Sequence, residues 1–558
     1  MYVEENSWIT KSGKKYNSIL LRESYRDNGK VKKRTIANLS KQSSKGITAI
    51  KLALKYKDNL TALGSLKESV ELQEGPSIGA AWTLYKVAKA LNIEKALGTN
   101  FAGKLALWQI IARVIDQGSR LSAVRLAQTH AACEILDFKR GFDENDLYSN
   151  LGWLSDNQEK IEKSLFRRRG GNKPEIFLYD VTSSYLEGDM NAFAEFGYNR
   201  DGKKGKKQIV IGMLCDEFGD PVSTEVFAGN TQDPKTFYPQ VKKVAERFGC
   251  KGVTFVGDRG MIKSTQIDNL PEGFHYITAI TKPQIQSMRK KKYIQLGLFD
   301  EDVCEVVNDD VRYILRRNPC RAAEIQHSRL SKQNNIEIFV KGKNTYLCEH
   351  PRAKVSKAIE HVAEKIKRLK IEGWLKVEAK DRTLSLKIDE EALREASALD
   401  GCYAIKTNLP QDVADKQAVH DRYKDLALVE KAFRVSKTEH LEVRPVYVRF
   451  EKSTRGHVFV VMLAYKITRV LRNAWAEFDL TVEECLKRLS TLCSMEMKVK
   501  NEEPCLKIPR PREESQNLLK ALNIRLPLAL PKRKVNVATR KKLMNRRKKL
   551  KNQNVITE

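Results

Sequence analysis

The chain has 558 residues, which is too long for a single hydrophobic core, so two to four domains are expected. Hydrophobic residues make up 41% and charged residues 31%, a balance that is typical of a globular protein and excludes a disordered one. Lys and Arg number 101 against 70 Asp and Glu, which gives a formal charge of +31. Such an excess favours a polyanionic partner, nucleic acid foremost. A ribosome-associated or generally basic housekeeping protein is the alternative that charge alone leaves open.

The cysteines and histidines argue against a zinc site. The ten cysteines form no CxxC pair, and none of the eight histidines lies near another in the sequence, whereas structural zinc needs closely spaced ligands. A chain of this size needs no disulfide framework, so reduced thiols are expected. The N-terminus lacks the apolar stretch of a signal peptide, and the apolar windows are too short to cross a bilayer. We therefore expect a cytoplasmic protein without membrane contact.

The first third of the chain changes from strand to helix periodicity. Residues 1–60 contain short alternating runs around turn signals, which predict a small basic β-hairpin module. Residues 75–170 carry apolar residues at helical spacing and end in the basic run 167–171. This pattern predicts a helical domain followed by a basic linker.

The next segment, residues 175–281, has a mixed α/β pattern. The sequence predicts three strands joined by short turns, then a helix and two further strands: 176–181, 208–215, 222–227, 236–248, 253–257 and 275–281. This order describes a sheet that is antiparallel first and parallel later. It is compatible with the first part of an RNase H-like core.

The remaining sequence predicts an interruption, the rest of the core and a tail. Residues 282–395 contain several strand-like runs and an amphipathic helix at 356–369, and they predict a β-rich insertion. Strand character returns at 402–407 within a second core part, 396–490, which also holds a long helix from Tyr423 to Lys437. Residues 495–558 are rich in Pro, Lys and Arg and predict a flexible basic C-terminal tail.

Three acidic residues stand where a carboxylate can reach a metal ion. Asp180 and Asp258 each follow an apolar run typical of a buried strand, and Glu430 lies in the predicted late helix. Several carboxylates can hold divalent ions against the attacking and leaving oxygens of a phosphodiester. Oxygen ligands without clustered His or Cys favour Mg²⁺ over zinc. A lone Asp after a strand is, however, more often a turn or helix cap.

The helix around Glu430 has a regular charge pattern. Tyr423, Glu430 and Lys437 are seven residues apart, and Arg434 follows Glu430 by four, so all four share one helical face. A surface ladder of salt bridges is the ordinary interpretation of such a stripe. The functional interpretation is a metal-binding Glu430 flanked by cations that neutralise phosphate oxygens.

Together these motifs carry a family resemblance. The segments 179–183, 257–261 and 423–437, with 197–208 and 227–233, resemble bacterial insertion-sequence DDE transposases of the YREK-signature group. The signature is Tyr, two residues, Arg, three residues, Glu, six residues and Lys. Tyr423, Glu430 and Lys437 match it, but Leu426 occupies the Arg position, which Arg422 or Arg434 would have to replace.

The resemblance implies a fold, a site and a cofactor. The fold would be an RNase H-like catalytic core interrupted by the β-rich insertion, and Asp180, Asp258 and Glu430 would be catalytic ligands of Mg²⁺ or Mn²⁺. Trp374 would be the candidate for stacking on a flipped base, although packing in a small subdomain is the more ordinary role for it. The expected DNA- or phosphate-binding residues are Tyr423, Arg434, Lys437, Arg259, Lys203, Lys204, Lys206 and Lys207.

The resulting prediction is a transposase that binds the terminal inverted repeats of its own element, cleaves DNA and transfers the strand to a target. The hairpin module and helical domain would bind the double-stranded ends, two chains would pair them as a homodimer, and the protein would associate with the nucleoid. Asp233 and Asp400 are spare acids near the motifs and are expected to be structural or to support the site. Two rivals remain: a metal-dependent nuclease with the same core, and a non-catalytic DNA-binding protein.

Overall fold

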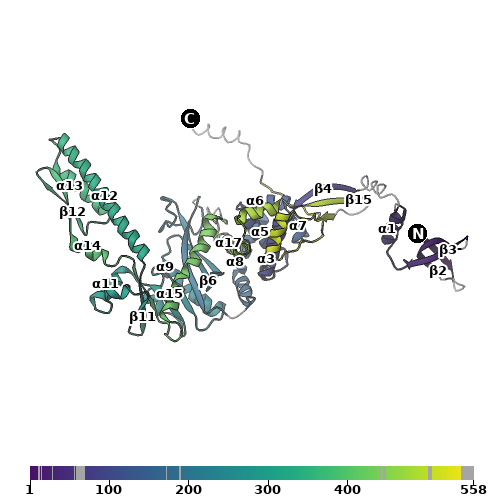
Figure 1. Cartoon of the computed structure of the whole chain (residues 1–558), viewed down its shortest axis with the longest axis horizontal. Helices are drawn as coiled ribbons and strands as arrows, with labels where there is room; N and C mark the ends of the chain where they lie inside the picture. Colours follow the sequence, from purple (N-terminus) through teal and green to yellow (C-terminus); the bar gives the residue numbers. More distant parts are fainter. Residues whose placement is uncertain are drawn as a thin grey trace.

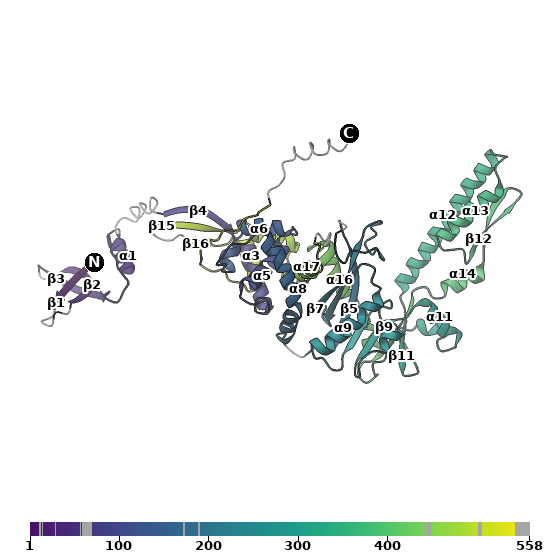
Figure 2. The same ribbon diagram turned by 180° about the vertical axis from the view of Figure 1, so that it is seen from behind.

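The computed structural model shows an elongated molecule with a small sheet at one end and a helical arm at the other (Figures 1 and 2). The large sheet and a helical domain lie between them. The structure describes the chain except residues 10–12, 14, 28, 56, 58–69, 171–172, 188–189, 440, 444–447, 500–504 and 542–558. Among the described residues, no helix is both long and apolar enough to cross a membrane.

The N-terminal module is a three-stranded antiparallel sheet rather than a simple hairpin. β2 (Lys15–Asp27) is the central strand, between β1 (Tyr2–Ile9) and β3 (Lys30–Asn38), and α1 (Ser44–Lys55) follows. The first strand was missing from the sequence prediction because its polar residues do not alternate. Of the helix, only Ile47 is buried, so this module has a very small core.

Residues 79–167 form a helical domain that also includes later parts of the chain. Its helices are α3 (Gly79–Ala90), α4 (Ile93–Leu97), α5 (Phe101–Ile115), α6 (Arg120–Thr129), α7 (Ala132–Ile135) and α8 (Glu144–Arg167). The long helix α17 (Glu451–Ala474) packs against α5 and α8, and α18 (Val482–Ser490) packs against α3. Gly456 permits the close approach of α17, since a Cβ there would lie 2.0 Å from the carbonyl oxygen of Leu151 on α8.

The large sheet has eight strands in the order β10-β11-β14-β9-β8-β5-β6-β7. β5, β6 and β7 are antiparallel neighbours, whereas β8 runs parallel to β5 and β9 parallel to β8. The strands after residue 175 are β5 (Ile176–Tyr185), β6 (Gln208–Asp216), β7 (Pro221–Ala228), β8 (Thr254–Gly257) and β9 (His275–Ala279). The fold is therefore mixed α/β with one large mixed sheet.

Helices cover the sheet and connect its strands. Between β7 and β8 the chain forms α9 (Asp233–Lys242) and the π-helical turn η2 (Lys243–Arg247), and α10 (Ser264–Ile267) precedes β9. On the C-terminal side lie α15 (Lys416–Lys424), α16 (Leu426–Arg434) and the π-helical turn η4 (Val435–Glu439). α16 contacts β5 and β6.

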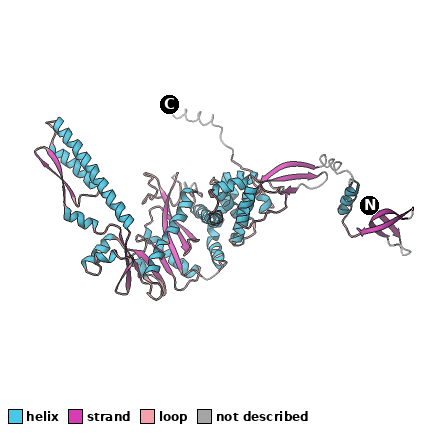
Figure 3. Ribbon diagram, viewed as in Figure 1, coloured by secondary structure: helices cyan, strands magenta, loops and turns pink. Residues whose placement is uncertain are grey.

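The predicted β-rich insertion is wrong in extent and, apart from the helix predicted at 356–369, in character. α12 (Pro319–Glu349) spans 31 residues, and α13 (Val355–Arg368) confirms the predicted helix. β12 (Leu375–Lys380) and β13 (Thr383–Ile388), of six residues each, form a hairpin beside them (Figure 3). The arm has its own apolar core and closes with α14 (Glu390–Ser397).

The start of the predicted insertion belongs to the large sheet instead. After α11 (Lys282–Lys290) and the short η3 (Leu296–Phe299), β10 (Cys304–Asn308) pairs with β11 (Val311–Arg317). β11 then pairs with β14 (Cys402–Thr407), which is itself antiparallel to β9. The arm therefore emerges between two adjacent strands of one sheet.

The predicted flexible tail is also wrong for the part that the structure describes. β15 (Cys493–Val499) pairs with β4 (Val70–Ser77), and β16 (Cys505–Lys507) and β17 (Ala529–Pro531) complete a four-stranded sheet. The helix α19 (Glu513–Ala521) lies between β16 and β17 in the sequence. Further on, Arg540 forms an ion pair with Asp143 at the start of α8. The last part of the predicted tail, 542–558, lies outside the described residues.

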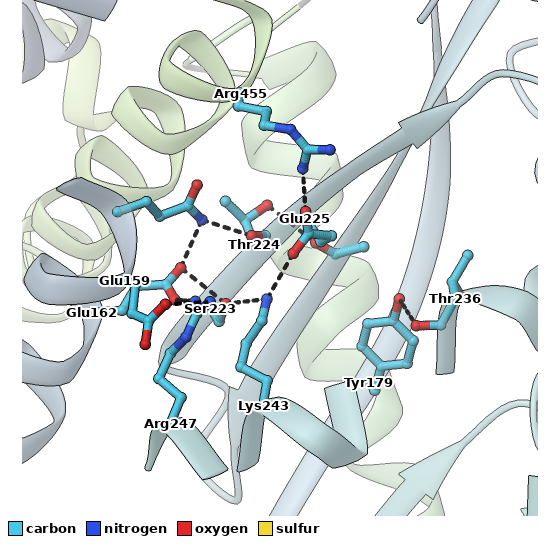
Figure 4. A network of polar contacts seen from close by, with 12 residues as sticks. Glu159, Glu162, Tyr179, Ser223, Thr224, Glu225, Thr236, Lys243, Arg247 and Arg455 are labelled. Atoms are coloured by element: carbon cyan, nitrogen blue, oxygen red, sulfur yellow. Dashed lines mark hydrogen bonds and ion pairs between the residues drawn. The ribbon is translucent and has the colours of Figure 1, made fainter. Parts of the chain in front are cut away.

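A buried polar network ties the helical domain to the large sheet (Figure 4). Glu162 on α8, fully buried, accepts hydrogen bonds from Ser223 on β7 at 2.9 Å and from Arg247 at 2.6 Å. Lys243 donates to Ser223 at 2.9 Å and to Glu225 at 3.0 Å. Glu225 also pairs with Arg455 on α17. The network thus joins α8, β7, η2 and α17.

We expect Glu162→Ala to destabilise the protein by about 3–5 kcal/mol, because removing one member of a buried ion pair leaves its partner charge uncompensated. The thermal unfolding midpoint of the full chain measures the loss. Glu159→Ala is the matched control, since Glu159 also approaches Arg247, at 3.5 Å, but is 65% exposed and such pairs contribute little. Equal effects of the two substitutions would contradict the role given to the buried network.

Candidate active site

The register between two parallel strands brings Asp180 and Asp258 together. Tyr179 on β5 is opposite Gly257, the last residue of β8. Asp180 is the next residue of β5 and Asp258 follows the end of β8, and the same ends of parallel strands lie at one edge of a sheet. β5 does not end at Asp180 as expected, because its pairing with β6 continues to Tyr185. Asp180 instead lies where the neighbouring strand β8 stops.

Glu430 reaches the same place from a helix that is not continuous. α15 ends at Lys424, Asp425 forms a turn, and α16 carries Glu430, so the predicted single helix from Tyr423 to Lys437 is interrupted. The last part of that segment continues as the π-helical turn η4. Val429 and Phe433 lie on the buried face of α16, and Glu430 lies on its exposed face.

The three carboxylates line one cavity of about 680 Å³. Asp180 is half-buried, and Asp258 and Glu430 are exposed. Tyr423 and Leu426 also line this cavity. The remaining lining residues are Val181, Thr182, Arg200, Asp233, Met261, Asn318, Tyr403, Lys424, Ala427 and Phe433.

Burial and like charge perturb two groups in the cavity. Burial raises the pKa of Asp180 to about 7, and the charges of Asp258 and Glu430 act in the same direction. The amide of Val181, which donates to Asp180 at 2.7 Å, and the charge of Arg200 oppose that rise. Burial, and then the neighbouring Asp258, raises the pKa of Tyr423, which therefore stays a neutral phenol. Asp180 thus carries its negative charge at a cost that a bound cation would offset.

Arg200 and Asp233 are site residues that the sequence analysis did not assign to the cavity. Arg200 lies on the segment between β5 and β6, and its Nη2 donates to both carboxylate oxygens of Asp233, at 2.6 and 2.7 Å. Asp233 begins α9. The pair places a guanidinium beside the acidic cluster. The signal was present in the motif 197–208, which holds this Arg among the lysines.

Lys437 is buried beneath the site. Its Nζ donates to Thr182 Oγ1 at 3.0 Å, to the carbonyl oxygen of Ser183 at 2.5 Å and to Asp201 at 2.7 Å. Lys437 and Asp201 have side chains only 10% and 4% exposed. In this conformation Lys437 holds the strand that carries Asp180, and a contact with phosphate stays a prediction.

The two arginines proposed to replace the missing signature Arg do not line the cavity. Leu426, at that position, is buried at the cavity wall. Arg422 is exposed and lies 3.4 Å from Asp425, and Arg434 is exposed. The guanidinium that does reach the cavity is that of Arg200.

The other predicted DNA contacts lie on exposed turns or away from the site. Arg259, Lys203, Lys204 and Lys206 are exposed, and Lys207 is half-buried. Lys206 lies 3.5 Å from Glu187. Trp374 is 5% exposed in the core of the arm, so its indole presents no free face to a base, and the packing interpretation fits its surroundings.

Asp400, the second spare acid, has a different role from the three carboxylates. It pairs with Arg329 of α12 at 2.7 Å and lies at the base of the arm. The cavity that it lines contains none of the three carboxylates. It therefore fixes the arm to the sheet.

The donor set fits a hard divalent cation. Asp180, Asp258 and Glu430 offer only oxygen ligands, which Mg²⁺ and Mn²⁺ prefer. Among the residues that the structure describes, no group of three or more His, Cys, Asp or Glu is close enough to hold one ion together. The carboxylates therefore share a cavity without forming a finished three-ligand site.

Comparison with known proteins gives one family match. Residues 8–65 match the N-terminal domain of IS1634 family transposases. This match supports an insertion-sequence transposase. It covers the N-terminal module and not the cavity, so assignment to the YREK-signature group stays a prediction. No curated protein matches the chain.

One solved structure is a distant neighbour. It is the cryo-EM structure of a piggyBac transposase synaptic complex with hairpin DNA, with a TM-score of 0.33 and 10% identity. The alignment covers 75% of this chain and 82% of that chain. A TM-score of this size does not establish a shared fold.

We expect the contribution of Asp180 to the free energy of unfolding, measured without divalent metal, to fall as the pH rises from about 4 to about 7. The pKa of Asp180 is about 7 in the folded chain against 3.8 for an ordinary Asp. The folded state therefore binds more protons than the unfolded state in this window, and removing them disfavours folding. Denaturant titrations of the wild type and of Asp180→Asn at a series of pH values measure this contribution as their difference. The stability of the wild type should fall relative to that of Asp180→Asn across the window, and a constant difference would contradict the assignment.

Lys437→Met should lower the thermal unfolding midpoint by the equivalent of about 3–5 kcal/mol, because the buried Asp201 loses its cation. Lys431→Met, at an exposed lysine of α16, is the control and should leave the midpoint unchanged. If Lys437→Met weakened DNA binding while the midpoint stayed constant, the original phosphate-binding hypothesis would be correct instead.

Proposed function

We propose that this protein is the transposase of an insertion sequence, which binds the terminal inverted repeats of its element and moves it by metal-dependent DNA cleavage and strand transfer. Asp180, Asp258 and Glu430 would be the catalytic carboxylates. The observation that carries the proposal is their convergence in one cavity, in a chain whose N-terminal residues match a transposase domain.

The sheet supports an RNase H-like catalytic core. Its central part is antiparallel through β7, β6 and β5, and parallel through β5, β8 and β9. This is the arrangement expected from the sequence for such a core. The cavity lies at the edge where β8 ends, a usual place for ligands in α/β folds.

The chemistry would be phosphoryl transfer at a DNA phosphodiester. Divalent ions held by the three carboxylates would neutralise developing charge and activate the attacking oxygen. Arg200, held by Asp233, would lie beside the scissile phosphate, and the half-buried Tyr423 would orient Asp258. Hydrolysis at the element's end would free a 3′-hydroxyl group, which would then attack the target strand.

The partner would be double-stranded DNA. A formal charge of +31 favours a polyanion, and the N-terminal module and the helical domain would bind the ends. Because two ends must be held together, a homodimer on DNA is expected. The protein would act in the cytoplasm, at the nucleoid.

The absence of a close three-ligand group among the described acids favours one rival, a non-catalytic DNA-binding protein. A metal-dependent nuclease without strand transfer is the other. Both rivals differ from the proposal in the products that they give, so a single assay separates all three.

We expect a plasmid carrying the element's ends to be cut and rejoined at a new site by the purified chain with Mg²⁺. Asp180→Asn, Asp258→Asn and Glu430→Gln should each lower the rate by at least about 100-fold, since each would remove a ligand of the metals. Asp421→Asn, at an exposed acid of α15 outside the cavity lining, is the matched control. Cuts without rejoining would indicate the nuclease, and full activity in all three variants would refute the metal assignment.

A further inference from the structure

Two strongly exposed aromatic residues lie on the segment that leads into β6. Phe196 is 62% and Tyr198 82% exposed. Each has a cation beside its ring: Lys207 Nζ lies 5.8 Å from the Phe196 centroid, and Arg200 Cζ 5.6 Å from the Tyr198 centroid. Lys203 Nζ lies 5.9 Å from the centroid of the Tyr185 ring. We call Phe196, Tyr198, Arg200, Lys203 and Lys207 the aromatic rim.

The backbone beneath the rim is fixed. Glu195 and Gln208 exchange two backbone hydrogen bonds, of 3.0 and 3.1 Å, and the Gln208 side chain donates to the Tyr198 carbonyl oxygen at 3.1 Å. At Gly197 a Cβ would lie 2.0 Å from the carbonyl oxygen of Gly229, so the segment lies tightly against the end of β7. The exposed rings are therefore presented by an ordered support, which lowers the entropy lost on binding.

The rim adjoins the cavity through Arg200. The backbone amide of Arg200 donates to Ser183 Oγ, at 3.0 Å, on the strand that carries Asp180. The side chain of Arg200 lines the cavity and its guanidinium lies beside the Tyr198 ring. If a phosphate of a DNA strand lay in the cavity, the neighbouring nucleotides of that strand would therefore lie at the rim.

Aromatic faces interleaved with cations suit unpaired nucleotides. A base stacks on an aromatic ring while lysines and arginines neutralise the backbone, and such stacking does not depend on sequence. A base inside a duplex has both faces covered by its neighbours. We propose that the aromatic rim binds unpaired nucleotides next to the cleavage site, with Tyr198 as the stacking residue; this inference rests on the proposed function.

A second copy of this chain is the competing occupant of the rim. The turn from Lys203 to Lys207 carries four lysines, so a self-contact there would bring like charges together, which is unfavourable. Nucleic acid removes that repulsion. The charge of the rim therefore favours a nucleotide over a second protomer.

The test is a binding measurement on the full chain in EDTA, where no cleavage occurs. The probes are a forked duplex of arbitrary sequence with 2-aminopurine in its unpaired arm, and a blunt duplex of the same sequence. The wild type should prefer the fork and quench 2-aminopurine fluorescence. Tyr198→Ala should reduce the preference about tenfold and relieve the quenching. Tyr198→Phe should retain both, as should Tyr293→Ala, a control at a 46% exposed tyrosine between α11 and η3.

An unchanged preference and quench in Tyr198→Ala would overturn the proposal. The proposal would also fall if Tyr198→Ala lost the preference and, in sedimentation, converted a dimer of the wild type to a monomer. The rim would then be a contact between two copies of the chain. Failure of the proposed function is separate: it would appear as Mg²⁺-dependent activity that survives substitution of the three carboxylates, whatever the binding result.

Discussion

The parallel register between β5 and β8 is the constraint on which the candidate site depends. With Tyr179 opposite Gly257, Asp180 and Asp258 must emerge side by side, and α16 can then bring Glu430 to the same cavity. A shift of one residue would turn one of the aspartates to the other face of the sheet. The buried network around Glu162 holds the helical domain to β7, which lies two strands from β5 in the sheet. Lys437 contacts β5 directly.

Local patterns indicated the central strands and the two aspartates that follow apolar runs, whereas Glu430 was selected by the resemblance to a family signature. The runs before Asp180 and Asp258 are apolar because β5 and β8 lie inside the sheet. The turn 217–220 between β6 and β7 is short enough to require antiparallel neighbours. The connection from β5 to β6, residues 186–207, is not the short turn that was predicted. Glu430 was found by its register with Tyr423, although the helix breaks between them at Asp425. These features depend on neighbouring residues, which a sequence displays directly.

Features set by distant contacts could not be predicted in this way. The burial of Lys437 depends on Asp201, which is 236 residues away. β15 finds its partner β4 at the other end of the chain. The arm helix α12 buries only Ile336, Val340 and Leu347 of its 31 residues, so it lacks the continuous apolar stripe by which helices are recognised.

The central claim is that the acids of β5, β8 and α16 together hold a divalent metal. Iron-directed cleavage of the protein tests it most directly: Fe²⁺ replaces Mg²⁺, ascorbate and peroxide generate radicals at the ion, and mass spectrometry maps the cut peptide bonds. The account predicts cuts close to Asp180, Asp258 and Glu430, suppressed by excess Mg²⁺. Cuts confined to other segments, or none that Mg²⁺ suppresses, would contradict it.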